Sequence, residues 1–208
     1  MLFRSAKSSV FHFPYLFFGL AAIFLDIGLE MISLGTVLDY AHSVGMPNLI
    51  FLGINWLAPA VFVSYATFSM IAGYLLGILL IPKYLSQPQA LMYSSLLGLG
   101  IAILILFTPT VVSVFMVALL GLANAFFWPA IWPLSIEGLG RFTKKGASIL
   151  VIGISGGAVI PLLFGWLVDL WGYQPAYILC IPCYLYILFF ALKGHETGKK
   201  GYVSKKEI

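Results

Sequence analysis

Charged residues are scarce in this chain. Among its 208 residues there are 7 Asp and Glu and 11 Lys and Arg, together 9% of the sequence. There are only 2 cysteines and 3 histidines, and the histidines and acids show no spacing that would hold a metal ion. No loop that could cradle a nucleotide phosphate is present. These shortages argue against a metal centre and against ATP hydrolysis by this chain, and we expect no cofactor.

Apolar residues dominate instead, at 62% of the sequence, with a mean hydropathy of +1.05. A soluble core of this size would not tolerate such a composition. Runs of roughly 20 apolar residues, rising about 1.5 Å per residue, can cross a hydrocarbon layer about 30 Å thick. The runs are too long and too uniform for barrel strands, so the spans must be helices. We predict an all-α membrane protein with a bundle of six transmembrane helices over residues 13–192, at 13–38, 57–82, 89–107, 111–136, 146–168 and 174–192.

The positions of the basic residues predict the orientation. Every Lys and Arg falls on one side of the predicted spans, the side that also holds both termini. Cytoplasmic loops carry such an excess, so we predict a multi-pass protein of the inner (plasma) membrane with a cytoplasmic segment at 1–12 and a basic cytoplasmic tail at 193–208. This orientation explains the net charge of +4 without a nucleic-acid partner. The basic residues are Arg4, Lys7, Lys83, Arg141, Lys144, Lys145, Lys193, Lys199, Lys200, Lys205 and Lys206.

The first apolar run carries two acids, Asp26 and Glu30. The run is longer than the core of a signal peptide, so we expect it to stay in the protein as a helix. An ionised acid in mid-span costs roughly 2.5–3.5 kcal/mol, so neither side chain should face lipid. Their four-residue spacing puts both on one helical face, where burial and mutual repulsion favour a protonated form. The pair is either a polar surface for a solute, with a proton carrier, or a structural pair bonded to neighbouring helices.

The fourth run contains a polar residue beside two aromatic ones. Asn124 shares a helical face with Trp128, and Trp132 follows one turn later. Indole rings can stack on the apolar face of a sugar, while an amide and a carboxylate bind its hydroxyls. We therefore predict that Glu30, Asn124, Trp128 and Trp132 bind substrate. The alternative is that either tryptophan packs within the bundle or lies in an aromatic belt at the membrane surface.

The segment GISGG, residues 153–157, matches the GxSxG pattern of serine nucleophiles. A serine nucleophile needs a base within hydrogen-bond reach, and His12, His42 and His195 all lie outside the predicted spans. Ser155 is better interpreted as a small residue that permits close helix packing. We therefore predict that the chain is not an enzyme.

Residues 137–172 read EGLGRFTKKGASILVIGISGGAVIPLLFGWLVDLWG, and this stretch resembles the sugar–proton symporter branch of the major facilitator superfamily. The most similar group is that of the fucose permeases and glucose/galactose transporters. The residues that carry the resemblance are Gly138, Leu139, Gly140, Thr143, Lys144, Gly146, Ser148, Gly156, Gly157, Ala158, Pro161, Gly165, Asp169 and Gly172.

The resemblance implies the C-terminal six-helix half of a twelve-helix transporter. AIFLDIGLE, residues 22–30, resembles the seventh helix of the family, in which Gly28 and Glu30 would face the sugar cavity. Asn124 falls where the tenth helix presents a polar residue to substrate. Asp26 stands where relatives usually have an aromatic residue, so it is the proton-coupling candidate. Tyr74 also departs from the pattern, since relatives often have an arginine there.

Transport in this fold requires a second six-helix bundle, because two bundles rock about a solute held between them. The second bundle would be a separate N-terminal half or, in a homodimer, a second copy of this chain; a third interpretation is a non-transporting remnant. We predict proton-coupled secondary active transport of a hexose- or fucose-like sugar. The alternatives are a facilitator-type exporter of drugs or organic acids and a membrane scaffold that only binds partners.

Overall fold

The computed structural model describes residues 9–81 and 83–199. Within them, six helical segments are long and apolar enough to cross a membrane, which confirms the predicted all-helical membrane fold. Parts of both predicted cytoplasmic ends, 1–8 and 200–208, lie outside the described residues. The basic residues in those two parts are Arg4, Lys7, Lys200, Lys205 and Lys206.

Three of the six segments are single helices and three are interrupted. The single helices are α1 (Pro14–Gly35), α3 (Pro59–Leu80) and α4 (Gln87–Phe107). The fourth segment consists of α5 (Thr110–Asn124) and α6 (Phe127–Ile136). The fifth consists of η2 (Gly140–Phe142), α7 (Thr143–Ile152), η3 (Gly153–Ser155) and α8 (Gly156–Trp171). The sixth consists of α9 (Tyr173–Ala176), η4 (Tyr177–Leu179) and α10 (Cys180–Leu192).

Short elements complete the described chain. They are η1 (Val10–His12), α2 (Val37–Val44), the antiparallel hairpin of β1 (Ile50–Phe51) and β2 (Ile54–Asn55), and η5 (Gly194–Glu196). The first apolar run extends to residue 38, but α1 ends at Gly35. Thr36, whose N–H and hydroxyl both donate to the Ile32 carbonyl, separates it from α2, which begins at Val37.

Two of the interruptions lie one turn before a proline. Proline has no N–H to donate to the carbonyl four residues earlier, and its ring crowds that carbonyl. Pro129 therefore leaves the carbonyl of Ala125 without its helical donor, at the point where α5 gives way to α6. Pro182 acts in the same way on Ile178, which lies in the tighter turn η4.

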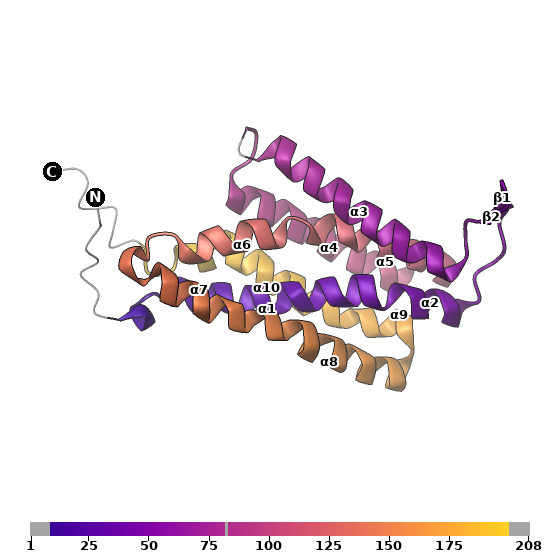
Figure 1. Cartoon of the computed structure of the whole chain (residues 1–208). Helices are drawn as coiled ribbons and strands as arrows, with labels where there is room; N and C mark the ends of the chain where they lie inside the picture. The colour runs from indigo at the N-terminus through magenta and orange to yellow at the C-terminus, as the bar shows by residue number, and fades with distance from the viewer. Residues whose placement is uncertain (1–8, 82, 200–208) are drawn as a thin grey trace.

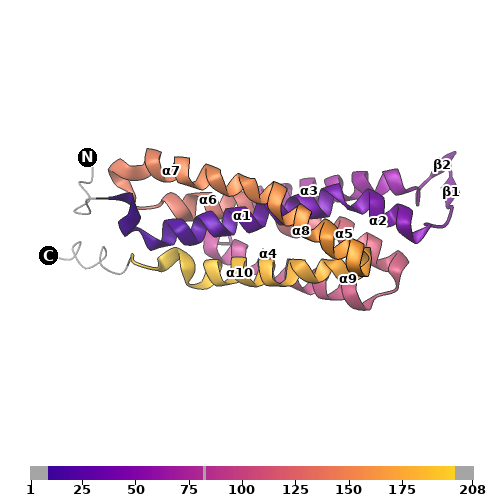
Figure 2. The ribbon, with the colours of Figure 1, turned by 90° about the horizontal axis from the view of Figure 1, so that it is seen from below.

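Helix α1 lies at the centre of the bundle, packed against α5, α6, α8 and α10 (Figures 1 and 2). Its contact with α8 is close because the facing residues are glycines. A Cβ on Gly156 would lie only 1.8 Å from the carbonyl oxygen of Phe24, so no other residue fits there without moving backbone. Gly73 of α3 similarly faces Ala125, whose Cβ would be 2.6 Å from an added Cβ. These approaches bring helix backbones together in the way that small residues allow in membranes.

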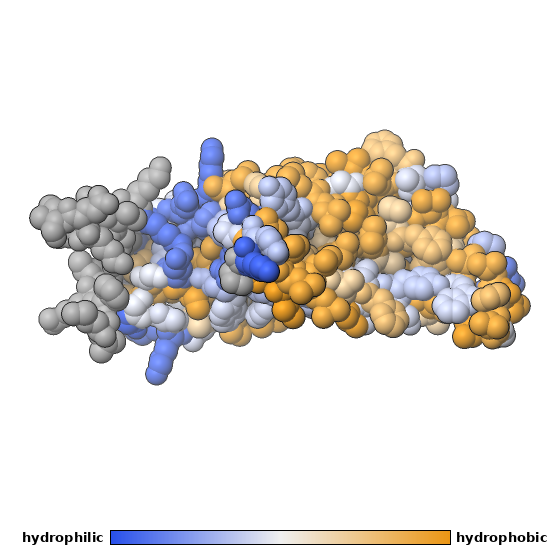
Figure 3. Space-filling model, turned by 90° about the horizontal axis from the view of Figure 1, so that it is seen from above, coloured by the Kyte–Doolittle hydropathy of each residue, from blue (hydrophilic) through white to orange (hydrophobic). Residues whose placement is uncertain are grey.

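The two ends of the bundle differ in polarity. The described chain ends lie at one end, and the β1–β2 hairpin lies at the other (Figure 1). In the face shown in Figure 3, hydrophilic side chains gather toward the end that holds the chain ends, and the rest of the face is mainly apolar. The basic residues in the described part are Lys83, Arg141, Lys144, Lys145, Lys193 and Lys199.

Helix α3 is the least buried of the six segments, with only 11% of its most apolar window inside the bundle. Phe68, Leu75 and Ile78 on this helix are 69%, 57% and 75% exposed. Exposed apolar residues on this scale would aggregate in water, so this face must be covered by lipid or by another bundle.

Candidate functional site

The two acids of α1 lie in different environments although they are only one turn apart. Asp26 is 1% exposed, whereas Glu30 is half-buried. Asp26 lies in the interior, on the face of α1 opposite to the one where Gly28 packs against Ile160 of α8. Within one turn of α1, the side chain thus changes from fully buried at Asp26 to partly accessible at Glu30.

The carboxylate of Asp26 is unsatisfied. Neither of its oxygens has a hydrogen-bond partner among the described residues. An ionised carboxylate buried without a partner costs several kcal/mol, so the neutral acid is the form that this environment favours. Buried polar groups are nearly always bonded in native proteins, so this exception makes Asp26 a candidate for a functional role.

Other ionisable groups close to Asp26 come from three helices. Glu30 on α1, Tyr74 on α3 and Tyr184 on α10 lie within electrostatic range of Asp26. Glu30 lies within electrostatic range of Tyr74 as well. These neighbours are two hydroxyls and one carboxyl, so they supply no positive charge to hold Asp26 in its ionised form.

Asn124 lies at the end of α5 in a buried hydrogen-bonded group and is 2% exposed. Its Nδ2 donates to Ser33 Oγ at 3.1 Å, and its Oδ1 accepts from the Tyr184 hydroxyl at 2.8 Å. Ser33 Oγ in turn donates to the Glu30 carbonyl oxygen at 3.0 Å. The side chain therefore joins α1, α5 and α10, and one of its two N–H donors remains for another partner.

Two members of this group, Ser33 and Tyr184, are not among the residues predicted from the sequence. Ser33 follows Glu30 by three residues on the same face of α1, a spacing that could have singled it out. Tyr184 is one of 11 tyrosines and carries no local signal of its own. The contact that gives it a role comes from a residue 60 positions away.

Trp128 and Trp132 of α6 lie against each other. Their ring centroids are 5.2 Å apart, with the planes tilted by 31°. Both are half-buried and pack partly against the apolar core, so each ring has one covered and one accessible portion. The two indoles form one aromatic surface, and they pack in the bundle at the same time.

A cavity of about 200 Å³ opens where α3 meets the break between α5 and α6. Its lining is mainly apolar and includes Gly77, Ile78, Phe126 and Pro129. Tyr74, which lies within electrostatic range of Asp26 and Glu30, also lines it. The cavity and the two acids of α1 therefore share Tyr74 as a neighbour.

Ser155, the serine of the GISGG segment, lies in η3. Its hydroxyl donates to the Ile152 carbonyl of its own helical segment at 2.8 Å. The glycines on either side make the close contacts: Gly153 and Gly156 both face the backbone of α1. The segment therefore serves the packing of α8 on α1.

No protein-family model matches the chain. A protein of Brucella abortus biovar 1 (strain 9-941) named glucose/galactose transporter is 28% identical over 191 residues, which cover 92% of this chain and 45% of that protein. A protein of Helicobacter pylori (strain ATCC 700392 / 26695), provisionally named a glucose/galactose transporter, is 26% identical over 198 residues, which cover 93% of this chain and 47% of that protein. The chain spans about half the length of the curated relatives it matches.

Among solved structures, the fucose permease FucP, a major facilitator superfamily transporter in the outward conformation, matches with a TM-score of 0.75. The match covers 85% of this chain and 41% of that one, at 21% sequence identity. The chain is therefore a multi-pass membrane protein with the fold of one half of a major facilitator superfamily transporter. Its sequence is similar over nearly its whole length to proteins named glucose/galactose transporters, which confirms the resemblance drawn from residues 137–172.

Proposed function

We propose that this chain is one of the two six-helix bundles of a proton-coupled sugar transporter. The similarity to proteins named glucose/galactose transporters and the shared fold with FucP support a sugar as the solute. The basic residues at one end of the bundle support an inner-membrane protein with both termini cytoplasmic. The resemblance of residues 22–30 to the seventh helix of the family supports its being the C-terminal one.

The proposal requires a second six-helix bundle. Transport in this fold proceeds by rocking of two bundles about a site near the membrane midplane, and one bundle cannot alternate access alone. The matched relatives are about twice as long as this chain, which supports such a partner. An N-terminal half, in the same or a separate polypeptide, is the first candidate, and a second copy of this chain is the next.

The sugar site lies between the bundles, with Glu30, Asn124, Trp128 and Trp132 as its residues on this side. Glu30 is half-buried, so its carboxylate can accept hydrogen bonds from sugar hydroxyls. The paired indoles supply the aromatic surface on which a pyranose ring stacks. Asn124 has one N–H donor left for a hydroxyl and holds the Glu30 segment of α1 in place through Ser33.

Asp26 carries the proton. The single observation that supports this role is that neither oxygen of its buried carboxyl group has a hydrogen-bond partner among residues 9–81 and 83–199. In the state described here the neutral acid is favoured; when the bundles rock and water reaches α1, the ionised form becomes favourable and the proton leaves. A group that alternates between these environments couples proton movement to the conformational change.

Uptake of labelled glucose, galactose and fucose into proteoliposomes tests the function. The protein samples are the full chain alone and a chimera that joins it to the part of the Brucella abortus relative with which it does not align. We expect sugar uptake by the chimera, reduced at least tenfold in Glu30→Gln, as the loss of a charge-assisted hydrogen bond worth about 1.5–3 kcal/mol implies. Asp39→Asn, which changes an exposed acid of α2, is the matched control and should transport normally.

Stabilisation by solute provides a second measurement, which does not depend on the chimera. Binding of a sugar raises the unfolding temperature of the chain by mass action. Stabilisation by hydrophobic cations or organic acids in place of sugars would indicate the exporter. No stabilisation by any of these solutes, together with no uptake, would indicate a scaffold and contradict the proposal.

A further inference from the structure

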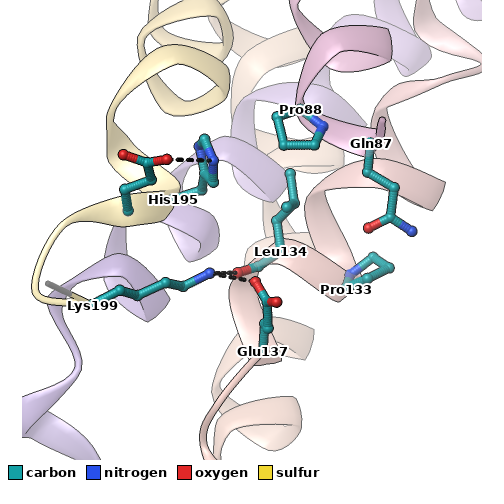
Figure 4. Close-up of a pocket in the computed structure, with 8 residues that line it drawn as sticks. Gln87, Pro88, Pro133, Leu134, Glu137, His195 and Lys199 are labelled. Atoms are coloured by element: carbon teal, nitrogen blue, oxygen red, sulfur yellow. Dashed lines mark hydrogen bonds and ion pairs between the residues drawn. The ribbon is translucent and has the colours of Figure 1, made fainter. Parts of the chain in front are cut away.

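A charged pocket of about 430 Å³ lies at the end of the bundle that holds the described chain ends. Figure 4 shows Gln87 and Pro88 of α4 on one side, Lys199 and His195 on the other, and residues of α6 between them. Its volume is within the range of about 300–1,000 Å³ that small-molecule sites occupy. None of the residues proposed to bind sugar lines it, so it is a separate site.

The pocket lies at the level where the spans end. Gln87 is the first residue of α4, and Glu137 directly follows the last residue of α6. His195 follows the end of α10 by three residues. Three spans thus bring polar side chains together at one membrane surface, which is where lipid headgroups lie.

The charged groups of the pocket have both signs. Lys199 Nζ lies 2.7 Å from Glu137 Oε2 and 3.5 Å from the Leu134 carbonyl oxygen. His195 Nδ1 lies 3.0 Å from the Phe190 carbonyl oxygen, and Nε2 lies 3.9 Å from Glu196 Oε1. Glu137 and Glu196 are 68% and 62% exposed, so each has room for a second partner. An ammonium group can pair with either exposed carboxylate, and a phosphodiester can accept from the Lys199 ammonium or the Gln87 amide.

The charged pocket adjoins the apolar cavity described above. Gln87 lines both, and Pro129 of the cavity lies one turn before Pro133 of the pocket on α6. An amphiphile whose head occupies the pocket can therefore place an apolar chain along α3 and α6, against Ile78 and Phe126. A soluble phosphate compound would leave that cavity unfilled.

We propose that this pocket and cavity bind one phospholipid whose headgroup carries a phosphodiester and a primary ammonium, as phosphatidylethanolamine does. The pocket has two carboxylates and one lysine ammonium, so its acidic charges outnumber the lysine and disfavour a headgroup with net negative charge. A primary ammonium donates three hydrogen bonds to them, whereas a quaternary ammonium donates none. The choice among phospholipids is set by Glu137, Glu196, Lys199 and Gln87.

The test measures thermal unfolding of the full chain in detergent with increasing amounts of added lipid. The probes are phosphatidylethanolamine, phosphatidylcholine and phosphatidylglycerol with the same acyl chains, and soluble phosphoethanolamine. We expect phosphatidylethanolamine to raise the unfolding temperature at the lowest concentration. Equal effects of the three lipids, a stronger effect of phosphatidylglycerol, or an equal effect of phosphoethanolamine would overturn the proposal.

Two variants at the start of α4 separate binding from folding. Gln87→Glu places a negative charge in the pocket and, at a helix N-terminus, does not weaken the helix. It should raise the half-saturating concentration of phosphatidylethanolamine about tenfold, the effect of losing a charge-assisted hydrogen bond worth about 1.4 kcal/mol. Gln89→Glu adds the same charge outside the pocket and keeps the acceptor for Ser86. If both variants weaken lipid binding equally, the pocket is not the site. This assay measures lipid binding and not sugar uptake, so its outcome is independent of the test of the proposed function.

Discussion

Replacement of Asp26 by leucine should stabilise the protein. The carboxyl group is 1% exposed and neither oxygen has a partner in the described part of the chain. A buried polar group without a hydrogen bond costs about 1–3 kcal/mol, and leucine has the same branching with methyl groups in place of the oxygens. The methyl groups are slightly larger than the oxygens, and crowding of this kind lowers the free energy of unfolding by about 1 kcal/mol. The net expectation is an increase in the free energy of unfolding of up to about 2 kcal/mol.

Reversible unfolding of the chain in mixed micelles, monitored by its helical circular dichroism, measures this difference. Asp39→Leu is the control, because the same substitution at an exposed acid outside the packed core should change stability by less than about 0.5 kcal/mol. Destabilisation by Asp26→Leu of more than about 1 kcal/mol, at an unchanged control, would refute the argument, since it would mean that the carboxyl group makes favourable bonds.

Three further substitutions test the packing and the site. Asn124→Ala should lower the free energy of unfolding by about 2–4 kcal/mol, because it removes two buried hydrogen bonds: the Tyr184 hydroxyl loses its acceptor, and Ser33 Oγ loses its donor and keeps only its bond to the Glu30 carbonyl. Tyr184→Phe, which removes one hydroxyl, should cost about half as much, and equal losses would contradict the hydrogen-bonded group. Gly156→Ala should disturb the packing of α8 on α1 and lower the free energy of unfolding by more than about 2 kcal/mol. Gly165→Ala is the control, because an added Cβ meets nothing within 4 Å there, and it should leave stability unchanged in the same assay. Trp128→Ala should weaken sugar-dependent stabilisation about tenfold through loss of ring stacking, and an unchanged sugar affinity would assign the indole to packing alone.

The six spans could be predicted from the sequence because the lengths of apolar runs and the membrane thickness determine them together. The interruptions follow in part from Pro129 and Pro182, whose effect on the preceding turn is local. The group of Ser33, Asn124 and Tyr184 could not be predicted, since its members come from helices far apart in the sequence. Likewise, the sequence shows that an acid lies at position 26. Whether a neighbouring helix supplies a hydrogen-bond donor to Asp26 depends on the tertiary packing and could not be predicted.

The pH dependence of sugar uptake in the variant Asp26→Asn tests the central claim most directly. Asparagine keeps the shape of the side chain but cannot carry a proton between the two sides of the membrane. In proteoliposomes that transport sugar, the unmodified transporter should take up sugar faster as the outside is acidified, with proton entry reported by an enclosed pH indicator. The account predicts that Asp26→Asn still exchanges sugar across the membrane but shows neither the acceleration nor the proton entry. Full pH dependence and proton entry in this variant would contradict it.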